Sequence, residues 1–173
     1  MKKMFSTLSL AVVAVGLALQ LPVPAMAGTA EDVQAAMQLL KSESAALGAA
    51  SVSGKDKVGD KTVPVLHFGK TAINNNFTIV DDVQQKTKAT ATFFVKEGNE
   101  FVRVATNVKK DDGSRAIGTV LDPKGKAIAA IAKDQSYYGE AAILGKPYIT
   151  GYEPIHDAKN KVIGVYYVGY PKS

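Results

Sequence analysis

The sequence predicts an α+β domain in which one long N-terminal helix packs on an antiparallel β-sheet with short helical connectors. Two observations predict this class. Apolar residues recur at helical spacing only near the start of residues 28–173, and the rest of that range consists of short apolar runs separated by turn residues. A length of 173 residues suits one ordinary domain with its own core.

Residues 1–27 are predicted to be a secretory signal peptide that forms no part of the fold. Lys2 and Lys3 give it a positive start, and Ala25–Ala27 has the small-x-small pattern of a cleavage site. An uncleaved membrane anchor is the alternative, but the apolar run between them, Leu8–Leu21, is short for a span of about 20 residues. We therefore expect a secreted, periplasmic protein with no transmembrane span after cleavage.

Residues 28–50 are predicted to form the N-terminal helix of the domain, from Thr29 to about Leu47. Thr29 can cap this helix with Asp32 as its reciprocal partner, and a glycine follows at its end. The apolar residues at helical spacing are Val33, Ala36, Met37, Leu40 and Leu47. Because this apolar face is small and alanine-rich, we expect the helix to lie flat on another element.

Residues 51–173 are predicted to form the sheet, and its first half is interrupted by polar segments. A polar loop is expected at Ser51–Thr62, where glycine, lysine and aspartate are frequent. One apolar run follows at Val63–Phe68, and another at Phe77–Val80 after a turn of three asparagines. We expect Asp81–Lys88 to be a polar connector that can form a helical turn.

The second half of the sheet has clearer signals. Glu97–Asn99 is a hairpin turn between a β-rich run, Ala89–Val95, and the returning strand, Phe101–Val108. A short helix is expected at Ile128–Ala132. Three antiparallel strands are then predicted at Ala141–Leu144, Pro147–Pro154 and Val162–Gly169.

Composition and motifs exclude several classes of function. The chain has no cysteine, which excludes disulfides, thiol chemistry and thiolate metal sites. Its net charge of +5 comes from scattered lysines and not from a basic block, so nucleic acid is not expected as a partner. His67 and His156 lie far apart outside any metal motif, and no catalytic constellation is recognisable. We therefore expect no enzyme, no metal and no cofactor.

Arg103 and Arg115 are the only arginines in a lysine-rich chain, and they lie close together in sequence. A guanidinium is a planar fork that captures a carboxylate through two hydrogen bonds, whereas a lysine ammonium is a point charge. The clustering predicts that both arginines are placed for such geometry. Arg115 is the stronger candidate, because it lies in a loop from which it could approach a ligand directly. The alternatives are an ion pair from Arg103 to Glu100 or Asp81, and an Arg115 that caps a loop carbonyl.

All seven tyrosines lie at or after Tyr137. Tyrosine combines an apolar ring with a polar hydroxyl, which suits the lining of a partly hydrated pocket. Strand parity places Tyr148, Thr150 and Tyr152 on one face of their predicted strand. We therefore expect Tyr137, Tyr148 and Tyr152 to line a pocket, and Tyr166, Tyr167 and Tyr170 to cover an edge of the sheet.

The chain resembles the single Cache domains of the Cache_3-Cache_2 fusion type in two stretches, TATFFVKEGNEFVRVATNVKKDDGSRAIGT at 90–119 and GKPYITGYEPIHDAKNKVIGVYYVG at 145–169. Such domains form the extracytoplasmic sensor portion of many bacterial chemoreceptors and histidine kinases. The resemblance implies a long N-terminal helix packed on a PAS-like antiparallel sheet. It also implies a pocket for a small molecule, often an organic acid, between that sheet and the connectors over it.

The resemblance and the residue pattern together predict a stand-alone, extracytoplasmic sensor protein that binds a small organic acid. A carboxylate of the ligand would pair with Arg103, Arg115 or both. Hydrogen bonds and an apolar wall would come from Thr106, Tyr137, Tyr148, Tyr152 and Phe93. The alternative is an interaction module that modulates a membrane histidine kinase or chemoreceptor without its own ligand, through the small-residue helix face within Ala35–Ala50.

Overall fold

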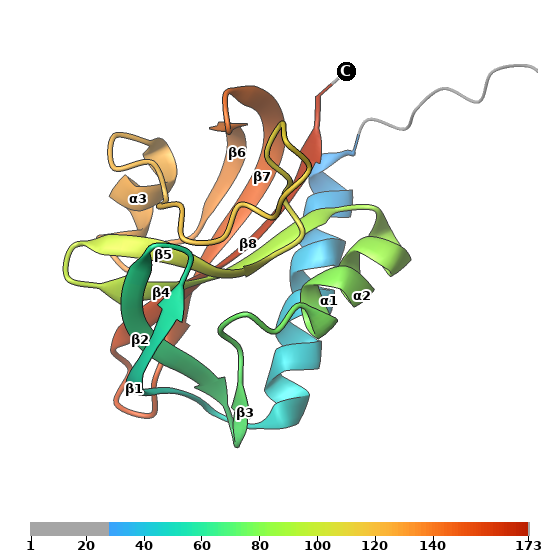
Figure 1. Cartoon of the computed structure of the whole chain (residues 1–173). Coiled ribbons are helices and arrows are strands. Elements are labelled where there is room, and N and C mark those ends of the chain that lie inside the picture. Colours follow the sequence, from blue (N-terminus) through green and yellow to red (C-terminus); the bar gives the residue numbers. More distant parts are fainter. Residues whose placement is uncertain (1–27, 173) are drawn as a thin grey trace, which may run out of the picture.

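The computed structural model describes residues 28–172 (Figure 1). The predicted signal peptide, residues 1–27, lies outside the described residues. One long helix comes first and antiparallel strands with short helices follow, which confirms the predicted α+β class. Within residues 28–172, none of the helices combines the length and the apolar character that crossing a membrane requires.

The N-terminal helix α1, Ala30–Leu47, begins at the predicted cap. The Thr29 hydroxyl accepts a hydrogen bond from the Asp32 N–H, and the Asp32 carboxylate accepts one from the Thr29 N–H at 2.8 Å, which completes a capping box. Gly48 ends the helix with a φ of 128°. The buried side chains of α1 are Val33, Ala36, Met37, Leu40 and Ser44.

A three-stranded sheet follows, and it corrects the prediction of a polar loop at Ser51–Thr62. β1, Ala50–Val58, pairs antiparallel with β2, Lys61–Phe68, and β3, Thr71–Ala72, pairs with the other edge of β2. The first strand of this hairpin is exposed along most of its length. It therefore lacks the alternation of apolar and polar residues by which a half-buried strand is recognised in sequence.

The residues predicted as an apolar run and a polar connector form one helix, α2, Thr78–Thr87. Only Val80 and Val83 of this helix are buried, so its apolar stripe is too short to predict a helix of this length. The helix ends at Lys88, which has a φ of 68°. α2 packs against α1 and against the main sheet.

The main sheet has five antiparallel strands in the order β5-β4-β8-β7-β6. They are β4, Thr90–Glu97, β5, Glu100–Thr106, β6, Tyr137–Ile143, β7, Lys146–His156, and β8, Val162–Pro171. The predicted hairpin and the three predicted C-terminal strands are confirmed, although β6 begins well before Ala141. A short helix, α3, Lys126–Ile131, overlaps the predicted one.

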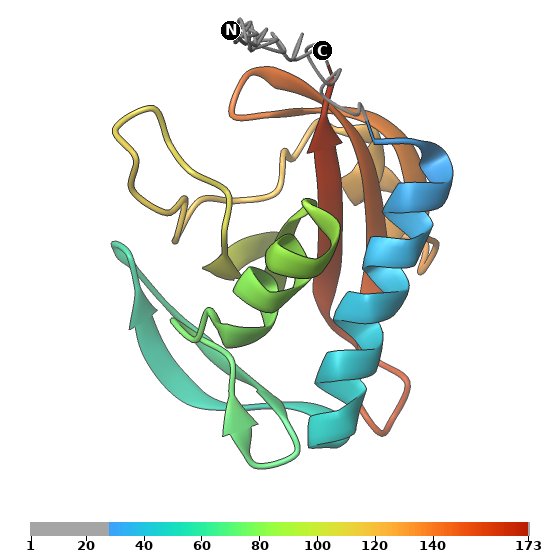
Figure 2. The same cartoon turned by 90° about the vertical axis from the view of Figure 1, so that its right-hand side faces the viewer.

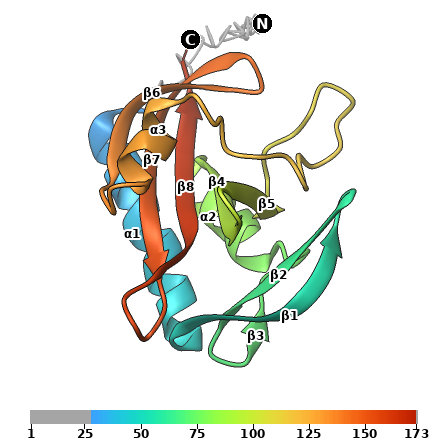
Figure 3. The same ribbon diagram turned by 90° about the vertical axis from the view of Figure 1, so that its left-hand side faces the viewer.

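The two faces of the main sheet are covered by different elements. Figure 2 shows α1 and α2 on one face, and Figure 3 shows α3 on the opposite face. Adjacent residues of β4 point to these two sides, because Phe93 belongs to the apolar core under α1 and Phe94 belongs to the core near α3. The sheet therefore separates two apolar cores.

A long connecting segment, residues 107–125, joins β5 to α3 and lies along the outer edge of β5. The Arg103 N–H donates a hydrogen bond to the Thr119 carbonyl at 2.8 Å, and the Leu121 N–H donates one to the Phe101 carbonyl at 2.9 Å. This segment and α3 together cover the sheet face opposite α1, and the candidate site lies between them and the sheet.

Candidate ligand-binding site

A cavity of about 370 Å³ lies between the main sheet, the end of the connecting segment and α3. β5 contributes Arg103 to its wall, β7 contributes Tyr152, and β6 contributes residues from Tyr137 to Ile143. Val120 and Leu121 of the connecting segment and Ala127 of α3 supply much of the apolar surface. The cavity wall therefore combines one guanidinium group and two phenol groups with apolar side chains.

Arg103 is the most unusual residue of this cavity, because its guanidinium is buried without a carboxylate partner. The residue is 4% exposed, and no ion pair among residues 28–172 includes it. One terminal nitrogen, Nη1, donates to the hydroxyl of Thr119, and the guanidinium lies 5.0 Å from the centre of the Phe94 ring. The buried Nε–H has no hydrogen-bond acceptor among the described residues.

Burial acts against the charge of this arginine. It lowers the pKa of the Arg103 guanidinium from its ordinary value, while Tyr167 and Tyr152 act in the opposite direction. An arginine side chain nevertheless stays protonated in proteins. An isolated buried charge is unfavourable unless an opposite charge and hydrogen-bond acceptors compensate it. The site therefore contains a buried positive charge without a counter-charge, which suits it to an anion.

Tyr137 and Tyr152 are direct cross-strand neighbours on β6 and β7, with ring centres 6.2 Å apart. The Tyr137 hydroxyl donates to the Glu140 carbonyl at 2.7 Å. The Tyr152 hydroxyl has no such partner among the described residues, although the residue is only 2% exposed. Burial raises the pKa of the Tyr152 phenol, so the group stays neutral and remains a hydrogen-bond donor.

Charged side chains surround the more open part of the cavity. Lys124 and Lys126 lie in its wall with Asp122 and Glu140. The Glu140 carboxylate is already paired with Lys172, whereas neither Lys124 nor Lys126 has a carboxylate within ion-pair distance among residues 28–172. With Arg103, these lysines leave an excess of positive charge at the cavity. This excess favours anionic molecules there.

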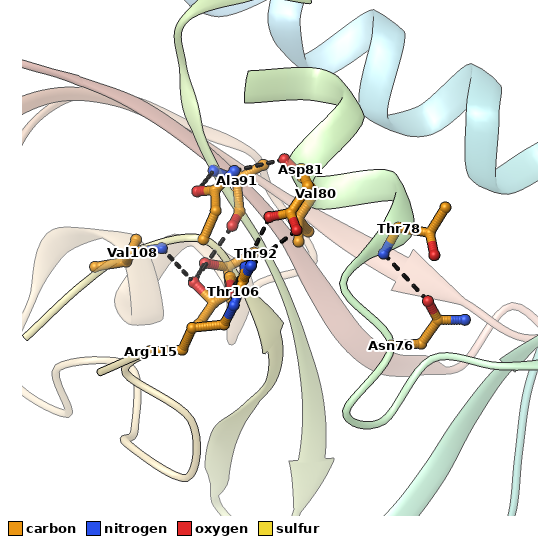
Figure 4. A network of polar contacts seen from close by, with 10 residues as sticks. Asn76, Thr78, Val80, Asp81, Ala91, Thr92, Thr106, Val108 and Arg115 are labelled. Carbon is orange, nitrogen blue, oxygen red and sulfur yellow. Dashed lines mark hydrogen bonds and ion pairs between the residues drawn. The ribbon is translucent and has the colours of Figure 1, made fainter. Parts of the chain in front are cut away.

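Arg115 lies outside this cavity, in a second polar cluster (Figure 4). Its two terminal nitrogens donate to the two carboxylate oxygens of Asp81 on α2, at 2.7 and 2.8 Å. Nη1 also donates to the Thr106 carbonyl at 2.8 Å, and the guanidinium lies 4.3 Å from the centre of the Phe77 ring. The carbonyl that Arg115 contacts belongs to strand β5 and not to a loop, and the carboxylate that it pairs with belongs to the chain itself.

The alternative ion pairs predicted for Arg103 do not form. Asp81 pairs with Arg115, and Glu100 pairs with Lys61 on β2. Both carboxylates therefore already have cations other than Arg103. Of the two arginines, the mid-strand Arg103 lines the cavity and Arg115, which was predicted as the stronger candidate, does not.

The other predicted ligand-binding residues lie away from the cavity wall. Thr106 shares a hydrogen bond of 2.6 Å with Thr92 inside the sheet, beside the Arg115 cluster (Figure 4). Phe93 packs against Phe68 on the opposite side of the sheet. Tyr148 is partly buried against the apolar core near α3, but it does not line the cavity. The structure therefore brings together Arg103, Tyr137 and Tyr152 of the predicted set.

Sequence reasoning missed the part of the wall contributed by residues 120–127 and by the β6–β7 turn. These residues have no motif, and their place beside Arg103 results from the path of the connecting segment. Within residues 28–172, no group of histidine, aspartate and glutamate side chains is arranged to hold a metal ion.

Comparison with known proteins gives one finding. The model of the Cache 3/Cache 2 fusion domain family matches residues 25–173. A search of curated proteins gave no match.

Proposed function

We propose that this chain, which belongs to the Cache 3/Cache 2 fusion domain family, senses a small organic acid through the cavity at Arg103. Membership of this family identifies the chain as an extracytoplasmic sensory and ligand-binding module. The identity of the ligand class and of the binding residues is the new part of the proposal. It rests on the chemistry of the cavity wall.

The observation that carries the proposal is the uncompensated charge of Arg103. Its Nε–H is buried without an acceptor, and no carboxylate of residues 28–172 pairs with it. A ligand carboxylate in the cavity would supply the missing opposite charge and would accept a hydrogen bond from the guanidinium. Charge-assisted hydrogen bonds of this kind contribute about 1.5–3 kcal/mol each. Two such bonds and some apolar burial suffice for micromolar binding, which corresponds to about 8 kcal/mol.

The rest of the wall narrows the ligand to a small acid with a short carbon skeleton. The neutral Tyr152 hydroxyl is available as a donor for a second ligand oxygen. Val120, Leu121 and Ala127 offer apolar contacts and no further charge in this part of the wall. A volume of about 370 Å³ lies within the range of small-molecule pockets.

We propose that the protein acts in the periplasm, and that a membrane receptor or histidine kinase reads its liganded state. The alternative, an interaction module without a ligand, has less support, because it would leave the charge of Arg103 uncompensated in both the free and the docked protein.

A thermal-shift screen with small organic acids, followed by calorimetric titration, tests the proposal. At least one acid should raise the Tm of the protein, and Arg103→Met should abolish that shift. Lys96→Met is the matched control, because Lys96 is an exposed cation on the neighbouring strand β4 and does not line this cavity. The proposal fails if no acid stabilises the protein, or if Arg103→Met binds the same acid as tightly as the wild type does.

A further inference from the structure

The turn between β6 and β7 contains a residue that is unusual for its conformation. Leu144 and Gly145 connect the paired residues Ile143 and Lys146, and both have positive φ, 49° and 81°. A two-residue hairpin turn with positive φ at both positions is the type I′ turn, for which Asn-Gly is a preferred pair. Leucine has a Cβ and cannot form the local hydrogen bonds of asparagine, so this conformation is unfavourable for it.

Other residues with positive φ make the contrast clear. Among residues 28–172, the remaining non-glycine residues of this kind are Asn75, Lys88, Asp134 and Asn160. Asparagine and aspartate tolerate positive φ, and Lys88 is the C-cap of α2. Leu144 is therefore the apolar exception in this set. It is also 44% exposed, so burial in the core does not account for a leucine at this position.

The place of Leu144 in the site gives a reason for the leucine. Leu144 and its neighbour Ile143 both line the cavity that contains Arg103. Of these lining residues, Arg103 is 4% exposed and Leu144 is 44% exposed, so the guanidinium is shielded from solvent and the Leu144 side chain is accessible to it. Strained backbone that places a side chain at a pocket is a recurring property of binding sites.

We propose that Leu144 determines ligand specificity by closing the open end of the cavity over the carbon chain of the bound acid. This inference rests on the proposed function, because it assumes that the carboxylate pairs with Arg103. An acid held by its carboxylate at the buried end would direct its carbon chain toward the β6–β7 turn. Each methylene covered by Leu144 would then be removed from water on one side, so the protein would prefer longer acids to acetate.

Titration with acetate, butyrate and hexanoate tests this inference. In the wild-type protein, the Kd should fall by roughly twofold for each added methylene. Leu144→Asn should weaken hexanoate binding by about tenfold and acetate binding by less than twofold. It should also raise the Tm of the free protein by roughly 2–4 °C, because asparagine suits the turn. Leu144→Ala should weaken hexanoate binding in the same way without the rise in Tm.

Two further variants separate this inference from the proposed function. Lys88→Gly removes an unfavourable positive φ at a distant helix end, so it should raise the Tm and leave the dependence on chain length unchanged. Arg103→Met should weaken the binding of all three acids to a similar extent.

The outcomes are distinguishable. If Leu144→Asn keeps the wild-type dependence on chain length while Arg103→Met loses binding, the role of Leu144 is wrong and the proposed function stands. A Leu144→Asn protein with a lower Tm contradicts the conformational argument and overturns the inference as well. If the wild type binds none of the three acids, the inference is wrong. If Arg103→Met binds them as well as the wild type, the inference and the assigned site both fail.

Discussion

Arg103 and Arg115 are the same residue type in opposite electrostatic settings. Arg115 has the Asp81 carboxylate, a backbone carbonyl and an aromatic ring around its guanidinium, and the pair is partly open to solvent. Arg103 has an aromatic ring and one hydroxyl, no carboxylate among the described residues, and almost no exposure. This difference shows how a ligand-binding arginine can be recognised. The useful sign is that no carboxylate of the protein compensates its charge, and the number of its contacts is less informative.

The two settings also have opposite consequences for stability. The Arg115–Asp81 pair is partly exposed, and such a pair contributes on the order of 1 kcal/mol or less, to which the hydrogen bond to the Thr106 carbonyl adds about 1 kcal/mol. A buried charge without a partner lowers the stability of the free protein. Arg103 therefore weakens the unliganded fold, and a bound anion would remove that weakness.

The largest expected effect is on the free energy of unfolding, which should change in opposite directions in Arg115→Met and Arg103→Met. Arg115→Met should lower the free energy of unfolding by about 2 kcal/mol, because it removes the ion pair and the hydrogen bond to Thr106. Arg103→Met should leave the free protein equally stable or about 1–3 kcal/mol more stable, because it removes an uncompensated buried charge. Urea denaturation of both variants measures this. An equal loss of stability in both variants would show that the charge of Arg103 is compensated in the free protein, as that of Arg115 is.

The second effect concerns Thr119, whose hydroxyl accepts a hydrogen bond from Arg103 Nη1 and donates one to the Ala116 carbonyl. Thr119→Val should weaken binding of the acid by about tenfold, because the guanidinium loses the group that orients it. Calorimetric titration measures the change. The control is Thr92→Val, which alters a buried hydroxyl near Arg115 and should lower stability with less than a twofold change in Kd. Similar losses of affinity in both variants would argue against a specific role for Thr119.

A smaller difference is expected between two tyrosines of β7. Tyr152→Phe should weaken binding by about fivefold, because the Tyr152 hydroxyl lies in the cavity wall without another acceptor. Tyr148→Phe should leave the Kd unchanged, because Tyr148 lies outside the wall. If Tyr148→Phe has the larger effect, the ligand occupies another part of the sheet surface.

The smallest expected effect is that of pH. Burial raises the pKa of Tyr152 above its ordinary value of 10, so the phenol stays protonated throughout the neutral range and is lost as a donor only at higher pH. Arg103 stays charged over the same range, although burial lowers its pKa. The Kd for a carboxylate should therefore be constant between about pH 6 and pH 9, measured by titration in buffers of equal ionic strength. A marked loss of affinity near pH 8 would mean that a group other than Arg103 carries the positive charge that binds the carboxylate.

Local signals explain which elements could be predicted. The capping pair Thr29 and Asp32 and the turn Glu97–Asn99 are encoded by neighbouring residues, so α1 and the β4–β5 hairpin were predictable. β1 is exposed along most of its length, and α2 buries only Val80 and Val83. Neither has enough periodic burial to be distinguished from a loop, because their stability comes from pairing and packing with distant elements.

The residues of the candidate site also divide into those that the sequence indicated and those that depend on distant parts of the chain. The rarity of arginine in this sequence singled out Arg103, and the late position of the tyrosines singled out Tyr137 and Tyr152. The role of Arg115 was not predictable, because its partner Asp81 belongs to α2, of which the sequence indicated only a helical turn within a polar connector. The missed wall of residues 120–127 depends on where the connecting segment crosses the sheet, which no short-range pattern specifies.

The connecting segment also affects how the protein can associate. An exposed strand edge offers free backbone groups to a second chain and is a common starting point for aggregation. Along β5 these groups are already engaged, since Arg103 and Phe101 exchange hydrogen bonds with residues 118–121. At the other end of the sheet, β6 pairs only with β7 among the described residues. Any assembly by strand addition to the main sheet would therefore begin at β6, and pairing of two β6 edges would leave no free edge of that sheet for a third chain.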